Sequence, residues 1–90
     1  MIKAVICDDE LATRNIICHF LEEEQLPIEI VGNAEDGEEA IQLIKETSPR
    51  LIFLDIHMPQ KNGFQVIEEV SREAGAQIIV LTAFASFENA

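Results

Sequence analysis

Basic residues are scarce in this chain. Six Lys and Arg residues stand against 17 Asp and Glu residues, which gives a formal net charge of −11 at pH 7. Binding to nucleic acid depends on clustered Lys and Arg that contact phosphates, and the six basic residues here are scattered. We therefore expect no direct nucleic-acid binding by this segment. The acidic balance instead suits a site that holds a divalent cation.

Long apolar runs and cysteines are also few. No run reaches the roughly 18 apolar residues of a membrane span, and no charged-then-apolar leader is seen, so we expect neither membrane insertion nor export. Cys7 and Cys18 are too few for a disulfide framework. They fall in an expected strand and an expected helix, which is typical of reduced thiols in a cytoplasmic protein.

Apolar runs and turn residues predict four strands in one domain that spans residues 1–90. Short apolar runs predict buried strands at 3–7, 51–55 and 78–81. At 28–34, Ile28, Ile30, Gly32 and Ala34 alternate with Glu29, Val31 and Asn33, which predicts a half-exposed edge strand.

Apolar residues at helical spacing predict three helices between these strands. The first is expected at 11–24, the second after the turn at 36–37 and up to 48–49, and the third from Gly63 to Gly75. The β-α-β-α-β-α-β order predicts an α/β fold, a doubly wound parallel sheet with helices on both faces. The expected buried faces are Ile17, Phe20 and Leu21, then Ala40, Ile41 and Ile44, then Phe64, Ile67 and Val70.

Polar residues follow three of the four expected strands. Asp8 and Asp9 follow the first, Asp55 ends the third, and Thr82 follows the fourth. The carboxyl ends of parallel strands lie along one edge of the sheet, so these side chains are expected to meet there. Three carboxylates repel one another unless a cation neutralises them, and oxygen ligands favour Mg²⁺ or Mn²⁺.

A metal bound by carboxylates, with room for further oxygen ligands, indicates phosphoryl chemistry. The Asp55 carboxylate is then a candidate nucleophile that forms an aspartyl phosphate, and the Thr82 hydroxyl a candidate donor to a phosphoryl oxygen. Structural roles are the alternative for each residue. Asp8 and Asp9 suit the N-terminus of a helix, Asp55 suits a turn, and Thr82 suits a strand end.

Taken together, these motifs resemble the receiver domain of a two-component response regulator. They occur in order along nearly the whole chain. The matching segments are Asp8-Asp9, Asp36-Gly37-Glu38-Glu39-Ala40, Asp55-Ile56-His57-Met58-Pro59, Asn62-Gly63 and Thr82-Ala83.

The resemblance implies a role for each matching site residue. Asp55 would be the phosphate acceptor, Asp8, Asp9, Asp55 and the backbone carbonyl of His57 the Mg²⁺ ligands, and Thr82 the switch hydroxyl. A flavodoxin-like sheet with strand order 2-1-3-4 is implied. The implied partners are a sensor histidine kinase as phosphodonor and an output domain, which in the family is most often DNA-binding and active in transcription regulation. Such a domain catalyses only its own phosphorylation and dephosphorylation, so we do not expect an enzyme.

The chain departs from the family pattern at its C-terminal end. The family continues into a fifth strand, which ends in a Lys that pairs with the phosphoryl group, and a fifth helix. This chain stops at Ala90, and its only lysines are Lys3, Lys45 and Lys61. The fourth strand would then form an open apolar edge, so we expect a homo-oligomer or a strand-exchanged dimer.

Three other classes of protein remain as hypotheses. One is a non-switching structural or dimerising fragment of a receiver. Another is a Mg²⁺-dependent phosphohydrolase, which usually places a second Asp two residues after its nucleophile. The last is a flavin-binding module, which needs a phosphate loop of Ser, Thr and Gly where this chain has Asp8-Asp9-Glu10.

Overall fold

The computed structural model describes residues 1–58, 60–70 and 75–81, and strands and helices alternate along them. This order confirms the predicted α/β class, and the predicted strand bounds agree with the observed ones to within one residue. The elements are β1 (Ile2–Cys7), α1 (Leu11–Glu23), β2 (Ile28–Ala34), α2 (Gly37–Thr47), β3 (Leu51–Asp55), α3 (Gly63–Val70) and β4 (Gln77–Leu81).

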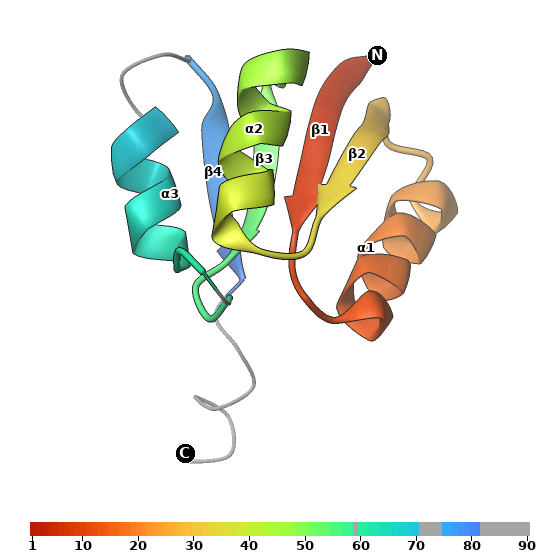
Figure 1. Ribbon diagram of the computed structural model, residues 1–90. Helices are drawn as coiled ribbons and strands as arrows, with labels where there is room; N and C mark the ends of the chain where they lie inside the picture. The colour runs from red at the N-terminus through yellow and green to blue at the C-terminus, as the bar shows by residue number, and fades with distance from the viewer. Residues whose placement is uncertain (59, 71–74, 82–90) are drawn as a thin grey trace.

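The four strands form one parallel sheet in the order β2-β1-β3-β4, as predicted (Figure 1). All four strands therefore deliver their carboxyl ends to the same edge, the lower one in Figure 1. The prediction that β4 is buried was wrong. Within the described chain it is an edge strand, which agrees with the expected open apolar edge, and Ile79 and Val80 are 45% and 38% exposed.

The helices cover both faces of the sheet. On one face, α2 and α3 pack against Val5, Cys7, Ile52 and Leu54. On the other face, α1 packs through Leu21 against Ala4, Ile6 and Phe53. Successive residues of β1 and β3 thus point to opposite helical layers, and this alternation explains why both strands are almost continuously apolar.

A bulge in β2 changes its predicted faces. The pairing with β1 shifts by one residue, because Ala4 faces Ile30 whereas Val5 faces Gly32. Ile30 therefore packs in the layer of α1, but Gly32 lies against Leu43 of α2. The simple alternation expected from residues 28–34 was wrong at this point, because a bulge inserts one extra residue and reverses the faces that follow it.

Two aromatic residues predicted on buried helix faces are exposed. Phe20 of α1 is 56% exposed and Phe64 of α3 is 67% exposed. In α3 the side chains of Val66 and Val70, four residues apart, are buried, which places Phe64 on the side of the helix away from the sheet. The predicted faces of α2 are confirmed, since Ala40, Ile41 and Ile44 are all buried. Among the described helices, none has the length and apolarity needed to cross a bilayer.

Candidate functional site

Three carboxylates meet at the carboxyl edge of the sheet. One carboxylate oxygen from each of Asp8, Asp9 and Asp55 lies within 4.8 Å of the other two. Asp8 and Asp55 are buried, with 4% and 8% of their surface exposed, whereas Asp9 is exposed. Asp9 and Asp55 are 46 residues apart in the chain, and the acids come together because β1 and β3 are neighbours in a parallel sheet.

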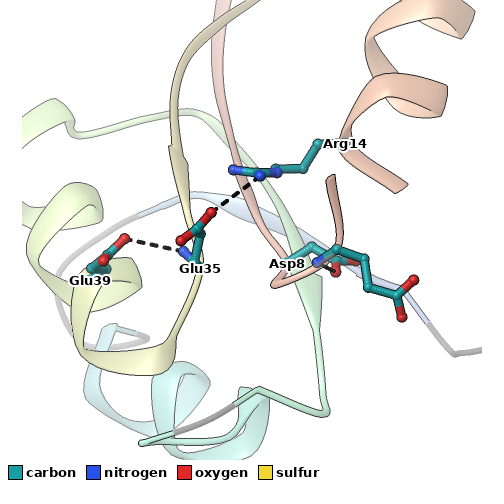
Figure 2. Close-up of polar contacts among 5 residues, drawn as sticks. Asp8, Arg14, Glu35 and Glu39 are labelled. Atoms are coloured by element: carbon teal, nitrogen blue, oxygen red, sulfur yellow. Dashed lines mark hydrogen bonds and ion pairs between the residues drawn. The ribbon is translucent and has the colours of Figure 1, made fainter. Parts of the chain in front are cut away.

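Asp8 is held at the end of β1 by its backbone and by its side chain. Its N–H donates to the Ala34 carbonyl at the end of β2, at 2.9 Å. Its Oδ1 accepts from the N–H of Glu10, at 2.8 Å (Figure 2). The alternative role at a helix start is thus partly present, because Asp8 binds the residue that caps α1. The side chain of Glu10 itself makes no capping hydrogen bond.

Burial disfavours the negatively charged form of the Asp8 carboxyl. Loss of solvation raises the pKa of its carboxyl, and the negative charges of Asp55, Asp9 and Glu10 raise it further. The hydrogen bond from the Glu10 N–H lowers the pKa and opposes part of this effect. We call the space among the carboxylates of Asp8, Asp9 and Asp55 the acidic pocket. A cation bound there would reduce the repulsion among the carboxylates and offset the cost of their desolvation, so the site favours a bound positive charge.

The loop after β3 is folded back on the strand end. Asp55 Oδ1 accepts from the N–H of His57, at 3.1 Å, in a turn that keeps the carboxylate at the pocket. The N–H of Gly63 donates to the Ile56 carbonyl, at 2.9 Å. A Cβ at position 63 would lie 2.6 Å from the Asp55 carbonyl oxygen, so only glycine lets α3 start this close to the strand.

The donor set fits a small hard cation. Mg²⁺ binds oxygen ligands at about 2.1 Å in an octahedron, so two ligands on opposite sides lie about 4.2 Å apart. The three carboxylate oxygens, which lie within 4.8 Å of one another, would move closer together around such an ion. In the described part of the chain, this trio is the one group of His, Cys, Asp or Glu side chains placed to share a metal ion.

The structure describes His57 but not Thr82, the two other predicted site residues. The side chain of His57 is exposed, and no hydrogen bond to it appears within the described residues. Thr82, the predicted switch hydroxyl, and Pro59 lie outside the described residues. The acidic pocket is therefore described through Asp8, Asp9, Asp55 and the backbone of His57.

Sequence reasoning missed a set of polar contacts beside the pocket. Arg14 of α1 points toward Glu35, with 3.3 Å between Nη2 and Oε1, and the Glu35 N–H donates to Glu39 Oε1 at 3.2 Å (Figure 2). These contacts join the start of α1 to the turn between β2 and α2. The Asp36-Gly37 dipeptide indicated that turn in the sequence. No local pattern links Glu35, beside the turn, to Arg14, which lies 21 residues earlier.

Comparison with known proteins identifies the family. The family model for the response regulator receiver domain matches residues 4–90. An uncharacterized response regulatory protein of Staphylococcus epidermidis is 36% identical over 88 residues, which are 98% of this chain and 35% of that protein. The transcriptional regulatory protein PdtaR of Mycobacterium tuberculosis is 38% identical over 82 residues, 91% of this chain and 39% of PdtaR.

Solved structures agree with this match. The receiver domain of AraT, a response regulator from Geobacillus stearothermophilus, superposes with a TM-score of 0.86 at 30% identity, over 97% of this chain and 68% of that one. The receiver domain of the putative response regulator NarL from Mycobacterium tuberculosis gives a TM-score of 0.80 at 30% identity, over 93% and 70%.

The chain spans about a third of the length of the curated relatives it matches. Its strand order, the acids at its carboxyl edge and the family match over residues 4–90 agree with one another. The chain belongs to the response regulator receiver domain family.

Proposed function

We propose that this domain accepts a phosphoryl group on Asp55. The observation that carries the proposal is the convergence of three carboxylates within 4.8 Å at the carboxyl edge of the sheet. Asp55 is the one that ends the central strand β3 and is held by the N–H of His57. Its second oxygen, Oδ2, accepts no hydrogen bond from the described residues and is the nucleophile in this proposal.

The transfer is a displacement at phosphorus. Asp55 Oδ2 attacks the phosphoryl group of a phosphohistidine, an oxygen–phosphorus bond forms, and the nitrogen–phosphorus bond breaks with its electron pair returning to the imidazole. Water later attacks the same phosphorus, which releases inorganic phosphate and restores the Asp55 carboxylate. The domain thus catalyses only its own phosphorylation and dephosphorylation, so it is not an enzyme with a separate substrate.

Asp8, Asp9, Asp55 and the backbone carbonyl of His57 are the proposed ligands of Mg²⁺, with Mn²⁺ as a substitute. When bound, the ion supplies the positive charge that lets an anionic phosphoryl group approach three acids. Burial of Asp8 and the raised pKa of its carboxyl support this assignment, because an unneutralised cluster is costly. The Thr82 hydroxyl is the proposed donor to a phosphoryl oxygen.

The proposed partners follow from the family. A sensor histidine kinase in the cytoplasm would donate the phosphoryl group, and an output domain on the same protein would respond. The names of relatives such as the transcriptional regulatory protein PdtaR support a role in transcription regulation. We also propose self-association of this chain, supported by the exposed edge strand β4.

Phosphorylation of the purified chain tests the central proposal. A small phosphodonor such as phosphoramidate, with Mg²⁺, should add the mass of one phosphoryl group to the intact protein. The adduct should be lost in Asp55→Asn, because an amide is not a nucleophile of this kind, and it should be absent when the metal is chelated.

Glu29→Gln is the matched control. Glu29 is an exposed acid near the start of β2, at the edge of the sheet opposite the pocket. This variant removes one negative charge, as Asp55→Asn does, and should be labelled like the wild type. Equal labelling of Asp55→Asn and the wild type would refute the assignment of the acceptor.

A further inference from the structure

We infer that the turn from the end of β2 into the first residues of α2, residues 34–39, positions the two halves of the acidic pocket, and that Gly37 is its key positioning residue. The inference rests on the proposed function, because it assigns a role to this turn in binding Mg²⁺. One half of the pocket is Asp8 and Asp9, after β1. The other half is Asp55 and the His57 carbonyl, after β3.

Gly37 packs directly against the loop that follows β3. It is the buried first residue of α2, and a Cβ placed there would collide with the carbonyl oxygen of Lys61 and lie 2.5 Å from the Lys61 carbonyl carbon. The obstacle is backbone, which cannot rotate away as a side chain can. Gly37 does not have a positive φ, so glycine is needed here for space and not for backbone conformation.

The loop that Gly37 touches is the one that carries the second half of the pocket. Lys61 lies four residues after His57 and two residues before Gly63, whose N–H binds the Ile56 carbonyl. The hydrogen bond between Gly63 and Ile56 thus joins the two ends of this short loop. We therefore expect a shift of the Lys61 backbone to move the segment that carries His57, whose carbonyl is the proposed metal ligand.

The other end of the turn contacts the first half of the pocket. The Ala34 carbonyl accepts the N–H of Asp8, and Glu35 pairs with Arg14 at the start of α1 (Figure 2). Inside the turn, Asp36 Oδ1 accepts from the Glu39 N–H, at 2.8 Å, and fixes the start of α2. The turn is thus a rigid spacer between Asp8 and Lys61.

Magnesium binding by glycine variants tests this inference. In Gly37→Ala the methyl group pushes the Lys61 backbone away, so the affinity for Mg²⁺ should fall about 10-fold, the size typical of a lost supporting contact around a metal. The chain has no Trp, so titration calorimetry with MgCl₂ alone is the suitable measurement. Each variant is first shown to be folded by urea unfolding.

Gly32→Ala is the control for general damage. The three atoms nearest to its Cβ would all belong to the side chain of Leu43, the closest at 2.6 Å, so the variant disturbs the packing of the same helix away from the pocket. Gly75→Ala, with no atom within 4 Å of the new Cβ, is the control for the substitution itself. Both should bind Mg²⁺ as the wild type does. If Gly32→Ala and Gly37→Ala lost affinity equally, or if neither lost any, the inference would be overturned.

Hydrogen exchange of the wild type gives a second test that does not depend on a variant folding. Because coupling between sites is reciprocal, Mg²⁺ should slow exchange at the amides of Glu39 and Ala40, which bind Asp36. The amide of Ser48, bonded to Ile44 at the far end of α2, should not change. Protection confined to the acids and to the loop after β3 would overturn the inference.

The outcomes separate this inference from the proposed function. A wild-type chain that binds no Mg²⁺ would overturn both. A wild-type chain that binds Mg²⁺, with Gly37→Ala binding equally well, would overturn only the role of the turn.

Discussion

At the scale of single residues, burial at the end of β1 has different consequences for the neighbouring residues Cys7 and Asp8. Burial, with the charge of Asp8 as a smaller cause, raises the pKa of the Cys7 thiol from 9.0 to about 12. Cys7 is therefore a neutral core residue and not a reactive thiol. The same lack of solvent raises the pKa of Asp8, where it creates a site that gains from a cation. Adjacent positions thus differ in function although their environments are similar.

Cys7 predicts a specific alkaline instability. In the unfolded chain the thiol loses its proton near pH 9.0, but in the folded chain it keeps it until about pH 12. The unfolded state thus binds fewer protons in this window, so the free energy of unfolding should fall as pH rises, by up to about 1.4 kcal/mol per pH unit. Urea unfolding between pH 8 and 11 measures the slope. Cys18→Ala should keep it and Cys7→Ala should lose it; equal slopes in these variants would contradict the prediction.

At the scale of elements, the ends of the helices follow local chemistry. Before α3, Asn62 and Gln65 exchange hydrogen bonds between side chain and backbone, at 2.9 and 3.0 Å. This arrangement satisfies two N–H groups that have no partner inside the helix. At the end of α2, Ser48 adopts a left-handed conformation, with φ 47° and ψ 58°. That conformation is costly for a residue with a Cβ.

Replacing Ser48 with glycine should stabilise the domain. Ser48→Gly removes the Cβ that disfavours the left-handed conformation, so the free energy of unfolding should rise by about 1 kcal/mol. Ser48→Ala, which keeps the Cβ, should show no such gain. Urea unfolding of the two variants gives the comparison, and a less stable Ser48→Gly would mean that the glycine costs more in the unfolded chain than it relieves in the folded one.

At the scale of the whole molecule, the described residues cover only part of the sheet face that carries α1. A groove of about 360 Å³ runs between α1 and the sheet, and every described residue that lines it is apolar. It includes Phe20 of α1 and Ile79 of the edge strand β4, both exposed. An apolar groove beside an open strand edge supports the proposed self-association, with a second copy of the chain as the occupant.

Self-association should therefore depend on this face. The wild type should form dimers or larger species at tens of micromolar, and Ile79→Lys should shift it toward the monomer, because a buried lysine would be costly at the contact. Phe64→Lys is the control, since Phe64 is also an exposed apolar residue but lies on α3, on the opposite face of the sheet. Light scattering during size-exclusion chromatography gives the mass, and a monomeric wild type at these concentrations would refute the proposal.

Much of the fold could be predicted from short apolar runs. Leu51–Asp55 was predicted as a strand with its observed bounds, because a short run of apolar residues between turn residues is typical of a buried strand. The bulge in β2 could not be predicted, because it depends on the pairing with β1. The exposure of Phe20 and Phe64 depends on which part of a helix contacts the sheet, and helical spacing alone does not decide this for residues at the margin.

The order of residues along the chain was enough to predict which chemical groups end the strands. Because a parallel sheet gathers those ends at one edge, it was also enough to predict that Asp8, Asp9 and Asp55 would be neighbours. The contacts that brace the pocket became visible only in the folded molecule, in the backbone contact of Gly37 with Lys61 and the pairing of Arg14 with Glu35. The reason is physical: the order of strands follows from local patterns, whereas a close contact between two loops depends on the exact placement of every element between them.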